Sequence, residues 1–330
     1  MPSPEIIFDA LFAYQRSAAL KAAIDLDVFT AIDEGAHSAA DIAKRSGSAE
    51  RGIRILCDYL TIIGLLAKSG GAYQLTPDTA AFLSKKSPMY LGTTAQFLTL
   101  PEMKKNFDGL TETVRRGGVL PTGNTVADEN PVWVEFARSM APMMMPAGHA
   151  IAGMLGGPDG GAIKVLDIAA GHGMFGIIIA QANPNAEIVA VDWKPVLAVA
   201  EENARAAGVH SRYKTIAGDA FKVDFGTGYD VVLVPNFLHH FDHATCTTFL
   251  KKCHAALKPG GKVVVVEFVP NADRVSPPMA AAFSLTMLAG TPSGDAYTMA
   301  ELEKQLGDAG FRNISAHALP TPETVVLAQK

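Results

Sequence analysis

The segment from Lys164 to Gly176 constrains the fold of this chain more than any other. Its first residues predict a buried strand, and the glycines that follow predict a tight turn into a helix. Gly171 and Gly173 carry no side chain, so the backbone can approach a ligand there. The first N–H groups of the helix would point at that ligand. The segment therefore predicts a nucleotide-binding turn.

The spacing of the glycines leaves two interpretations of the ligand open. It matches GxGxxG, and Asp192 follows about 20 residues later, as in a dinucleotide site. With Asp167 and Ala169 it also matches DxGxGxG, the S-adenosylmethionine pattern, with alanine in the first glycine position. A carboxylate beside the turn suits a ligand that carries ammonium and sulfonium groups, whereas it would repel a pyrophosphate.

Length and composition predict a globular protein of two domains. The chain has 330 residues, of which 48% are hydrophobic and 18% charged, so it can bury one large core and a smaller one. Its 28 basic and 33 acidic residues give a net charge of −5, which provides no general attraction to nucleic acid or to an anionic membrane. We therefore expect small-molecule partners, with no nucleic acid and no membrane.

Cysteine usage and hydropathy predict a soluble cytoplasmic protein. Cys57, Cys246 and Cys253 form no CxxC pair, and the last two lie two turns apart in one predicted helix. Buried thiols in a reducing compartment are the simplest interpretation. The sequence has no charged start followed by an apolar run, and no stretch of about 20 apolar residues.

The first part of the chain predicts a winged-helix module. The predicted elements are helices within residues 5–32, 38–46 and 51–66 and a hairpin about a Gly-Gly turn at 65–75. Such modules often bind DNA, but residues 41–58 balance Lys and Arg against Asp and Glu. We therefore favour dimerisation over DNA contact.

Residues 90–155 predict helices with many bulky apolar side chains, including the run Met143–Met145. Core packing usually explains a methionine cluster. This cluster lies just before the glycine-rich linker 156–161, however, where a substrate cleft between domains would form.

From Ile163 onward, strands and helices alternate. Strands are predicted near residues 163–168, 186–191, 212–217, 229–234 and 262–268, followed by a helix at 299–309 and closing strands at 312–319 and 324–329. This order predicts a doubly wound α/β domain.

Three later motifs decide between the two ligands. Gly218–Phe221 follows the third strand, Pro235–Phe241 follows the fourth, and Leu257–Lys262 leads into the fifth. On these motifs the chain resembles, over nearly its whole length, the S-adenosylmethionine-dependent small-molecule O-methyltransferases. That family includes plant caffeate-type enzymes and bacterial polyketide and carotenoid O-methyltransferases.

The resemblance implies a fold and a domain organisation. The fold is a Rossmann-like class I methyltransferase domain with an N-terminal, mostly helical winged-helix dimerisation domain, and the enzyme is a homodimer. The implied divisions are a dimerisation domain over residues 1–90, a helical linker over 91–155 that contributes to the substrate pocket, and an S-adenosylmethionine-binding catalytic domain over 156–330.

The resemblance also implies how the cofactor is held. The turn at Gly171 and Gly173 would lie against the methionine part, and the Asp192 carboxylate would accept both ribose hydroxyls. Asp219 would hold the adenine amino group and Phe221 would pack on its ring. Asp192 or Asp219 alone could equally be a turn or cap residue. The implied cofactor-binding residues are Asp167, Gly171, Gly173, Asp192, Trp193, Gly218, Asp219, Ala220, Phe221 and Asn236.

In the same family the catalytic base falls at His239, and an acid that flanks it falls at Glu267. A histidine after a strand is more often structural, but the carboxyl ends of strands are where α/β sheets build their sites. The family usually has a second acid before the next helix, and Ala296 occupies that position here. Its neighbours, Asp295 and Tyr297, are candidate replacements.

The chemistry favours a phenolic or enolic hydroxyl as the methyl acceptor. Full proton transfer from a phenol, with a pKa near 10, to a histidine near 6.5 costs roughly 5 kcal/mol, and a nearby carboxylate lowers that cost. For an aliphatic hydroxyl the cost rises to about 12 kcal/mol. We expect direct in-line transfer from the sulfonium, with no metal and no covalent enzyme intermediate.

An apolar segment, residues 276–292, would roof the acceptor. Met279, Phe283 and Met287 keep spacings of four, so one helical face could present all three, although core packing is an equal alternative. The predicted pocket for a flat aromatic acceptor consists of Phe136, Met140, Met144, His240, Met279, Phe283 and Met287. Methylation of nitrogen or carbon on the same scaffold, and NAD-dependent oxidation, are the alternative functions.

Overall fold

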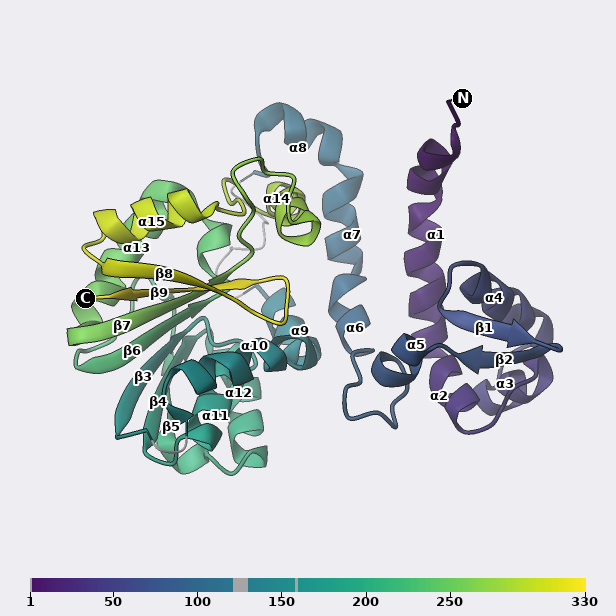
Figure 1. The fold of residues 1–330 in the computed structure, drawn as a ribbon, viewed down its shortest axis with the longest axis horizontal. Helices are drawn as coiled ribbons and strands as arrows, with labels where there is room; N and C mark the ends of the chain where they lie inside the picture. The colour runs from purple at the N-terminus through teal and green to yellow at the C-terminus, as the bar shows by residue number, and fades with distance from the viewer. Residues whose placement is uncertain (1, 121–129, 158–159) are drawn as a thin grey trace. The chain divides into compact units, whose positions relative to one another are not determined.

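The computed structural model of the protein describes residues 2–120, 130–157 and 160–330. The chain forms two compact units, Met1–Pro101 and Glu102–Lys330 (Figure 1). Two residues of the predicted glycine-rich linker, 158 and 159, lie outside the described part of the chain. The finer division at residues 90 and 155 stays a prediction.

The first unit is mostly helical and carries one β-hairpin, as predicted. Its elements are α1 (Glu5–Asp25), α2 (Val28–Asp33), α3 (Ala39–Ser46), α4 (Glu50–Ile62), β1 (Leu66–Ser69), β2 (Ala72–Leu75), α5 (Pro77–Phe82) and α6 (Thr94–Leu98). Its core includes Phe29, Ile42, Ile53 and Tyr73, each at most 1% exposed. These side chains come from α2, α3, α4 and the hairpin, so the helices and hairpin share one core.

Local sequence signals set the ends of these elements. The Ser38 hydroxyl accepts the N–H of Asp41 at 3.1 Å and caps α3. Gly70 and Gly71 have φ of 56° and 86° in the hairpin turn, a left-handed conformation that glycine adopts without strain. The predicted capped helix and Gly-Gly turn are confirmed.

The N-terminal half of α1 exposes large apolar side chains. Ile7, Leu11 and Tyr14 are 60%, 61% and 68% exposed, and Phe8 and Phe12 are each 51% exposed. Apolar patches of this kind mark surfaces that a partner covers. Among the described helices, α1 included, none is both long and apolar enough to cross a membrane.

The second unit is built around a seven-stranded sheet in the order β5-β4-β3-β6-β7-β9-β8. The strands are β3 (Ile163–Ile168), β4 (Ala186–Asp192), β5 (Tyr213–Ala217), β6 (Tyr229–Pro235), β7 (Leu257–Glu267), β8 (Arg312–Ala318) and β9 (Thr324–Gln329). β3 to β7 run parallel, whereas β9 and β8 pair antiparallel at one side. The predicted α/β order and both closing strands are confirmed.

One strand begins earlier than predicted. β7 starts at Leu257, which pairs with Tyr229, whereas the sequence predicted a strand from residue 262. The register shifts before the next pair, Val231 with Lys262, so the Lys-Pro-Gly-Gly segment forms a bulge inside the strand. Gly260, with φ of 78°, allows this bend.

Helices pack on both faces of this sheet (Figure 1). The helical elements are α7 (Pro101–Asp108), α8 (Leu110–Arg116), α9 (Val132–Ser139), α10 (Ala141–Met154), α11 (Met174–Ala182), α12 (Lys194–Ala206), η2 (His210–Arg212), η3 (Leu238–His240), α13 (His243–Ala256), α14 (Pro278–Gly290) and α15 (Met299–Asp308). α13 and α15 cover one face through residues such as Phe249 and Leu306. α10 packs along α11, where a side chain on Gly148 would collide with Ile178.

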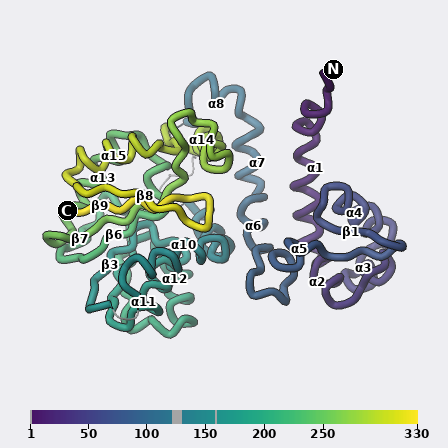
Figure 2. The backbone as a smooth tube through the Cα atoms, viewed as in Figure 1, coloured from purple at the N-terminus to yellow at the C-terminus, as the bar shows by residue number. Residues whose placement is uncertain are grey.

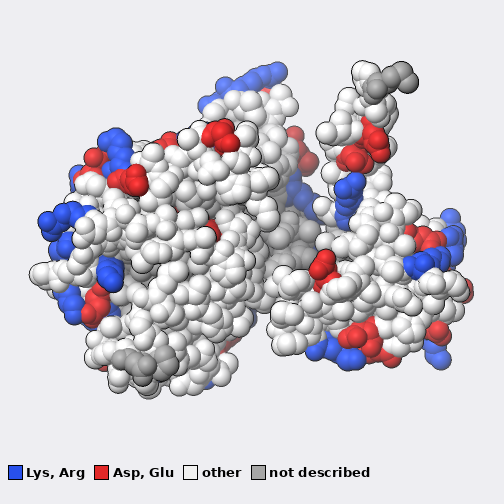
Figure 3. All heavy atoms as spheres, viewed as in Figure 1, with Lys and Arg blue, Asp and Glu red and all other residues white. Residues whose placement is uncertain are grey.

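Charges of both signs are interspersed on the surface. On the face shown in Figure 3, Lys and Arg lie among Asp and Glu on each unit. This mixture agrees with a net charge of −5 from 28 basic and 33 acidic residues. Charges mixed in this way largely cancel at a distance.

The carboxyl ends of the five parallel strands meet at one edge of the sheet, the carboxyl edge. The glycine turn follows β3, Asp192 ends β4, and Glu267 ends β7. β9 runs in the opposite direction, so it begins at this edge, where Thr324 pairs with Glu267. The turn between β8 and β9 lies at the same end of the sheet, on the right of the yellow hairpin in Figure 2.

Candidate active site

The glycine turn between β3 and α11 adopts a left-handed backbone. Ala169, Gly171 and Gly173 have φ of 49°, 57° and 75°. Ala169 thus takes a glycine conformation at the position where the motif usually has glycine. A side chain on Gly173 is excluded, because its Cβ would lie 2.6 Å from the Tyr213 hydroxyl. Gly171, His172 and Gly173 are themselves buried, so the glycines let this turn pack closely against Phe136 and Tyr213.

Asp167 lies fully buried beneath this turn. One carboxylate oxygen accepts the N–H of Gly176 at 3.1 Å, and the other has no hydrogen-bond partner among the described residues. Burial raises the pKa of Asp167 to about 7; the Gly176 hydrogen bond opposes this rise and the charge of Asp192 adds to it. The Tyr213 hydroxyl is buried in the same unpartnered state.

Asp192, at the end of β4, is held by the backbone on both sides. One carboxylate oxygen accepts the N–H of Gly171 at 2.8 Å, and the other accepts the N–H of Trp193 at 2.7 Å. Burial raises the pKa of Asp192 to about 6 against these two hydrogen bonds. Each oxygen keeps a second lone pair. The carboxylate is therefore fixed beside the glycine turn and can still accept donors from a ligand.

The segment after β5 forms a second fixed corner. Gly218 donates its N–H to the carbonyl of Asp192 at 2.9 Å. The Asp219 carboxylate accepts the N–H of Phe221 at 2.9 Å and pairs with Lys222 at 2.9 Å. Lys252 binds the carbonyl of Ala220 at 2.8 Å. The predicted adenine-binding residues are thus held close to Asp192.

α9 brings aromatic side chains to the glycine turn. Trp133 and Trp193 pack around a small apolar cluster that joins α9 to α12. Phe136, on the same helix, lies 3.5 Å from the point where a side chain on Gly171 would begin. Phe136 also stacks on His172, with ring centroids 6.1 Å apart.

His172, a buried residue of the glycine turn, was not among the residues that the sequence predicted for the site. It is 2% exposed, and burial lowers its pKa to about 4, so the imidazole is neutral at pH 7. Its Nδ1 accepts the N–H of Met174 at 3.0 Å, which places the ring proton on Nε2. The sequence feature that could have identified His172 is its position between Gly171 and Gly173.

His239 and Glu267 form a buried pair at the ends of β6 and β7. His239 Nδ1 lies 2.5 Å from Glu267 Oε2, and their side chains are 4% and 2% exposed. Glu267 Oε1 accepts the N–H groups of Leu238 and His239 at 2.9 and 3.3 Å. Because a carboxylate only accepts, Nδ1 carries the proton and Nε2 carries the lone pair. The structure therefore brings together the two residues that the sequence predicted as base and flanking acid.

The loop before α15 packs against the backbone of His239. A Cβ on Gly294 would lie 2.2 Å from the His239 carbonyl oxygen, so a side chain would collide there. Asp295 pairs with Arg274 at 3.2 Å, and the Tyr297 hydroxyl donates to a backbone carbonyl. The two candidate replacements for the second acid thus have other partners, and Glu267 is the acid that contacts His239.

α14 brings one predicted pocket residue to the base. The Phe283 ring lies edge-on to His239, with centroids 4.8 Å apart, and stacks on Phe268 at 4.0 Å. Met287 is buried on the same helix, whereas Met279 is 66% exposed. The pocket role of Met279 therefore stays a prediction, and its side chain lies in the solvent-exposed first turn of α14, which begins at Pro278.

The methionine cluster of α10 reaches the end of β6. Met140 and Met144 are buried, and the sulfur of Met144 accepts from the Asn236 amide at 3.6 Å. Asn236 has φ of 52°, which is uncommon for a residue other than glycine. Its side-chain oxygen is buried with no hydrogen-bond partner in the described ranges.

His240 is a second imidazole beside the base. Its ring centroid lies 4.3 Å from that of His239 and 5.3 Å from that of Trp133. Burial, and then the neighbouring His239, hold the pKa of His240 well below its usual range. Its Nδ1 is buried and has no hydrogen-bond partner in the part of the chain that the structure describes. His240 is therefore a neutral polar group next to His239.

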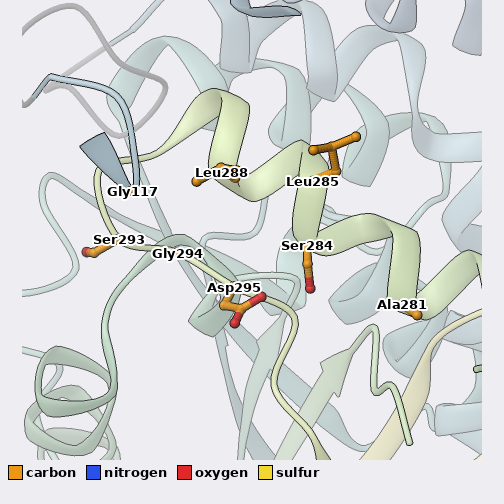
Figure 4. A pocket seen from close by; sticks show the side chains of 8 residues that line it. All are labelled: Gly117, Ala281, Ser284, Leu285, Leu288, Ser293, Gly294 and Asp295. Carbon is orange, nitrogen blue, oxygen red and sulfur yellow. The ribbon is translucent and has the colours of Figure 1, made fainter. Parts of the chain in front are cut away.

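A pocket of about 530 Å³ opens on another face of α14 (Figure 4). It is lined by Gly117, Ala281, Ser284, Leu285, Leu288, Ser293, Gly294 and Asp295. Helical spacing places its α14 residues away from Phe283, which faces the base. The sequence did not predict this pocket, because its walls come from three separate segments.

Comparison of the chain with known protein families finds two matching family models. Residues 8–85 match the O-methyltransferase dimerisation domain, and residues 160–312 match the O-methyltransferase domain. The chain belongs to the O-methyltransferase family. It is therefore an S-adenosylmethionine-dependent methyltransferase, and the dinucleotide interpretation of the glycine turn is wrong.

Relatives of this O-methyltransferase match it over its whole length. A crystal structure of a candidate O-methyltransferase from Nostoc punctiforme PCC 73102 is 52% identical, covers 100% of both chains and has a TM-score of 0.95. The 3-hydroxy-5-methyl-1-naphthoate 3-O-methyltransferase of Streptomyces sahachiroi is 28% identical over 97% of this chain and 92% of its own. The tetracenomycin polyketide synthesis 8-O-methyltransferase TcmO of Streptomyces glaucescens is 27% identical over 99% and 97%.

We predict that affinity for S-adenosylhomocysteine falls as the pH drops through about 6, the raised pKa of Asp192. Protonated Asp192 loses acceptor capacity, so the dissociation constant should rise by up to about tenfold per pH unit below that value. Calorimetric titrations between pH 5 and 8 measure this. Asp192→Asn should bind S-adenosylhomocysteine weakly and should not show the loss of affinity near pH 6. Asp167→Asn should still show that loss near pH 6. A dissociation constant for the wild type that is the same at pH 5 and pH 8 would contradict the role of Asp192.

Proposed function

We propose that this enzyme methylates a phenolic or enolic hydroxyl of a small, largely apolar aromatic molecule, with His239 as the general base. The observation that carries the proposal is the buried contact of 2.5 Å between His239 Nδ1 and Glu267 Oε2. This contact fixes the tautomer in which Nε2 can remove a proton from the acceptor.

The residues of the carboxyl edge fit S-adenosylmethionine. Asp192 keeps free lone pairs for the ribose hydroxyls, although two N–H groups already hold it. The left-handed turn at Gly171 and Gly173 would lie against the methionine part, and Asp219 with Phe221 would border the adenine. When bound, S-adenosylmethionine supplies a sulfonium methyl that the acceptor oxygen attacks in line with the sulfur.

Glu267 makes His239 an effective base for a phenol. The difference between the pKa of a phenol and that of a free histidine corresponds to roughly 5 kcal/mol for full proton transfer. A carboxylate 2.5 Å from Nδ1 stabilises the imidazolium as Nε2 takes the proton. The two backbone N–H groups on Oε1 keep Glu267 in this position. The His239–Glu267 pair therefore lowers the free-energy cost of proton transfer from a phenol. For an aliphatic alcohol, most of that cost remains.

The surroundings of the base favour a flat aromatic acceptor. Phe283 stands edge-on to His239 and stacks on Phe268. Phe136 lies at the glycine turn, and Met144 lies at the end of β6. Flat apolar walls of this kind bury an aromatic ring. The S. sahachiroi relative, which is named for a hydroxynaphthoate, supports an acceptor of this class.

We infer that the enzyme is a cytoplasmic homodimer. The match to the family's dimerisation domain covers residues 8–85. Within it, α1 exposes Leu11 and Tyr14 at 61% and 68%, a surface that a second copy would cover. All three cysteines are free and buried, which suits a reducing compartment.

Leu11→Glu should convert the dimer to a monomer, because the interface would have to bury an unpaired charge. Light scattering should give twice the mass of one chain for the wild type and the mass of one chain for this variant. Ala13→Glu, exposed on the opposite face of α1, serves as a matched control and should remain dimeric. A monomeric wild type would refute the inferred assembly.

His239→Ala should lower kcat by about 10²- to 10⁴-fold, the usual contribution of a general base, and leave the affinity for S-adenosylhomocysteine unchanged. Production of S-adenosylhomocysteine from a phenolic acceptor measures the rate, and calorimetry measures the binding. His317→Ala, on the exposed strand β8, is the matched control and should keep wild-type kcat. Near-full activity of His239→Ala would show that another group removes the proton.

A further inference from the structure

Gln305 on α15 has two buried side-chain atoms without partners, but most such atoms of the described residues lie at the carboxyl edge. Among the described residues they include Asp167 Oδ1, the Tyr213 hydroxyl, Asn236 Oδ1, His240 Nδ1, Thr321 Oγ1 and both oxygens of Glu323. Most buried polar groups in proteins have a hydrogen-bond partner, so each exception needs an explanation. Asp167, Asn236 and His240 lie where the cofactor and the base are expected. Glu323 and Thr321 have no such assignment.

Glu323 lies at the carboxyl edge through the pairing of β9 with β7. Thr324, the first residue of β9, pairs with Glu267, the last residue of β7. Glu323 comes immediately before Thr324, in the turn at the right of the hairpin in Figure 2. Glu323, although distant in sequence, therefore lies on the strand next to the one that ends at Glu267, the acid that contacts His239.

The sheet register also gives the face on which Glu323 lies. Val265 pairs with Val326, and both pack in the core with α13 and α15. Side chains alternate along a strand, so Val325 belongs to the opposite face, and an extended backbone at Glu323, the residue before β9, would continue that alternation. Glu323 therefore does not join the α13 and α15 core.

Glu323 differs from the other buried acids of the unit. It is 2% exposed, and neither carboxylate oxygen has a hydrogen-bond partner among the described residues. Asp167 accepts one N–H group, and Glu267 accepts two and contacts His239. A buried carboxylate with no donor is unfavourable for the fold alone, so a partner from outside the chain accounts for it best.

We propose that Glu323, together with Thr321, binds a hydrogen-bond-donating substituent of the acceptor, a hydroxyl or an amine, remote from the oxygen that is methylated. This inference rests on the proposed function. The cofactor residues follow β3, β4 and β5, the base follows β6, and β9 lies beyond β7. Adjacent strands are about 4.8 Å apart, so β6 and β9 are separated by about 10 Å. A two-ring aromatic with a substituent on each ring spans this separation.

A stability measurement tests whether Glu323 is kept for a ligand. Glu323→Leu should raise the melting temperature of the ligand-free enzyme by about 2 to 4 °C, because it removes an unpaired buried carboxylate. Glu303→Leu, at an exposed position on α15, is the matched control and should leave it unchanged. A melting temperature of Glu323→Leu at or below that of the wild type would overturn the proposal, because Glu323 would then support the fold.

A selectivity measurement tests the chemistry of the substituent. The probes are 1,5-, 2,6- and 2,7-dihydroxynaphthalene and their monomethyl ethers, which keep one methylatable hydroxyl but lose the remote donor. For at least one pair, the wild type should prefer the diol by tenfold or more in kcat/KM, which exceeds the twofold advantage of two equivalent hydroxyls. Glu323→Leu, which removes the acceptor oxygens, should reduce that preference to about twofold and leave the affinity for S-adenosylhomocysteine unchanged. The matching aminonaphthols show whether an amine serves as well as a hydroxyl.

The outcomes separate this inference from the proposed function. A wild type without donor preference, or a Glu323→Leu variant that keeps the preference, would overturn the inference. If S-adenosylhomocysteine binds but no naphthol is methylated, the dissociation constants of the diols and ethers from that complex are compared in the same way. Failure to bind S-adenosylhomocysteine would instead count against the proposed function.

Discussion

The parallel pairing of β3 to β7 is the constraint on which the site depends. It brings five strand ends to one edge, so that residues far apart in the sequence meet there. The two carboxylates that matter most, Asp192 and Glu267, are each held by two backbone N–H groups. For each, the donors include the turn that follows a neighbouring strand. The backbone of one strand end thus orients the acid of the next, and Glu267 in turn fixes the tautomer of His239.

The carboxyl edge contributes less to the stability of the fold than the apolar core below it, because it buries polar atoms without partners. Below it, valines such as Val263 and Val265 are fully buried in an apolar layer. At the edge, Asp167, Asn236 and Glu323 hold buried polar atoms without partners among the described residues. Such groups destabilise the ligand-free fold and become satisfied when a ligand supplies donors or acceptors.

Local patterns predicted most of the fold and much of the site. The glycine turn, the strands and the hairpin follow from short-range signals, and His239 with Glu267 followed from the family motifs. Contacts between distant segments were beyond reach: His172 depends on stacking with Phe136, and Glu323 reaches the edge only through antiparallel pairing. The exposure of Met279 was missed because spacing places a residue on a helical face but does not show where that face ends.

The most direct test of this account is a crystal structure of the enzyme with S-adenosylhomocysteine. The account predicts both ribose hydroxyls within hydrogen-bond distance of Asp192, and the sulfur directed at the space in front of His239 Nε2. It also predicts that the contact between His239 and Glu267 persists in the complex. A ligand whose ribose lies away from Asp192, or whose sulfur is separated from His239 by protein, would contradict the central claim that this edge aligns methyl donor and base.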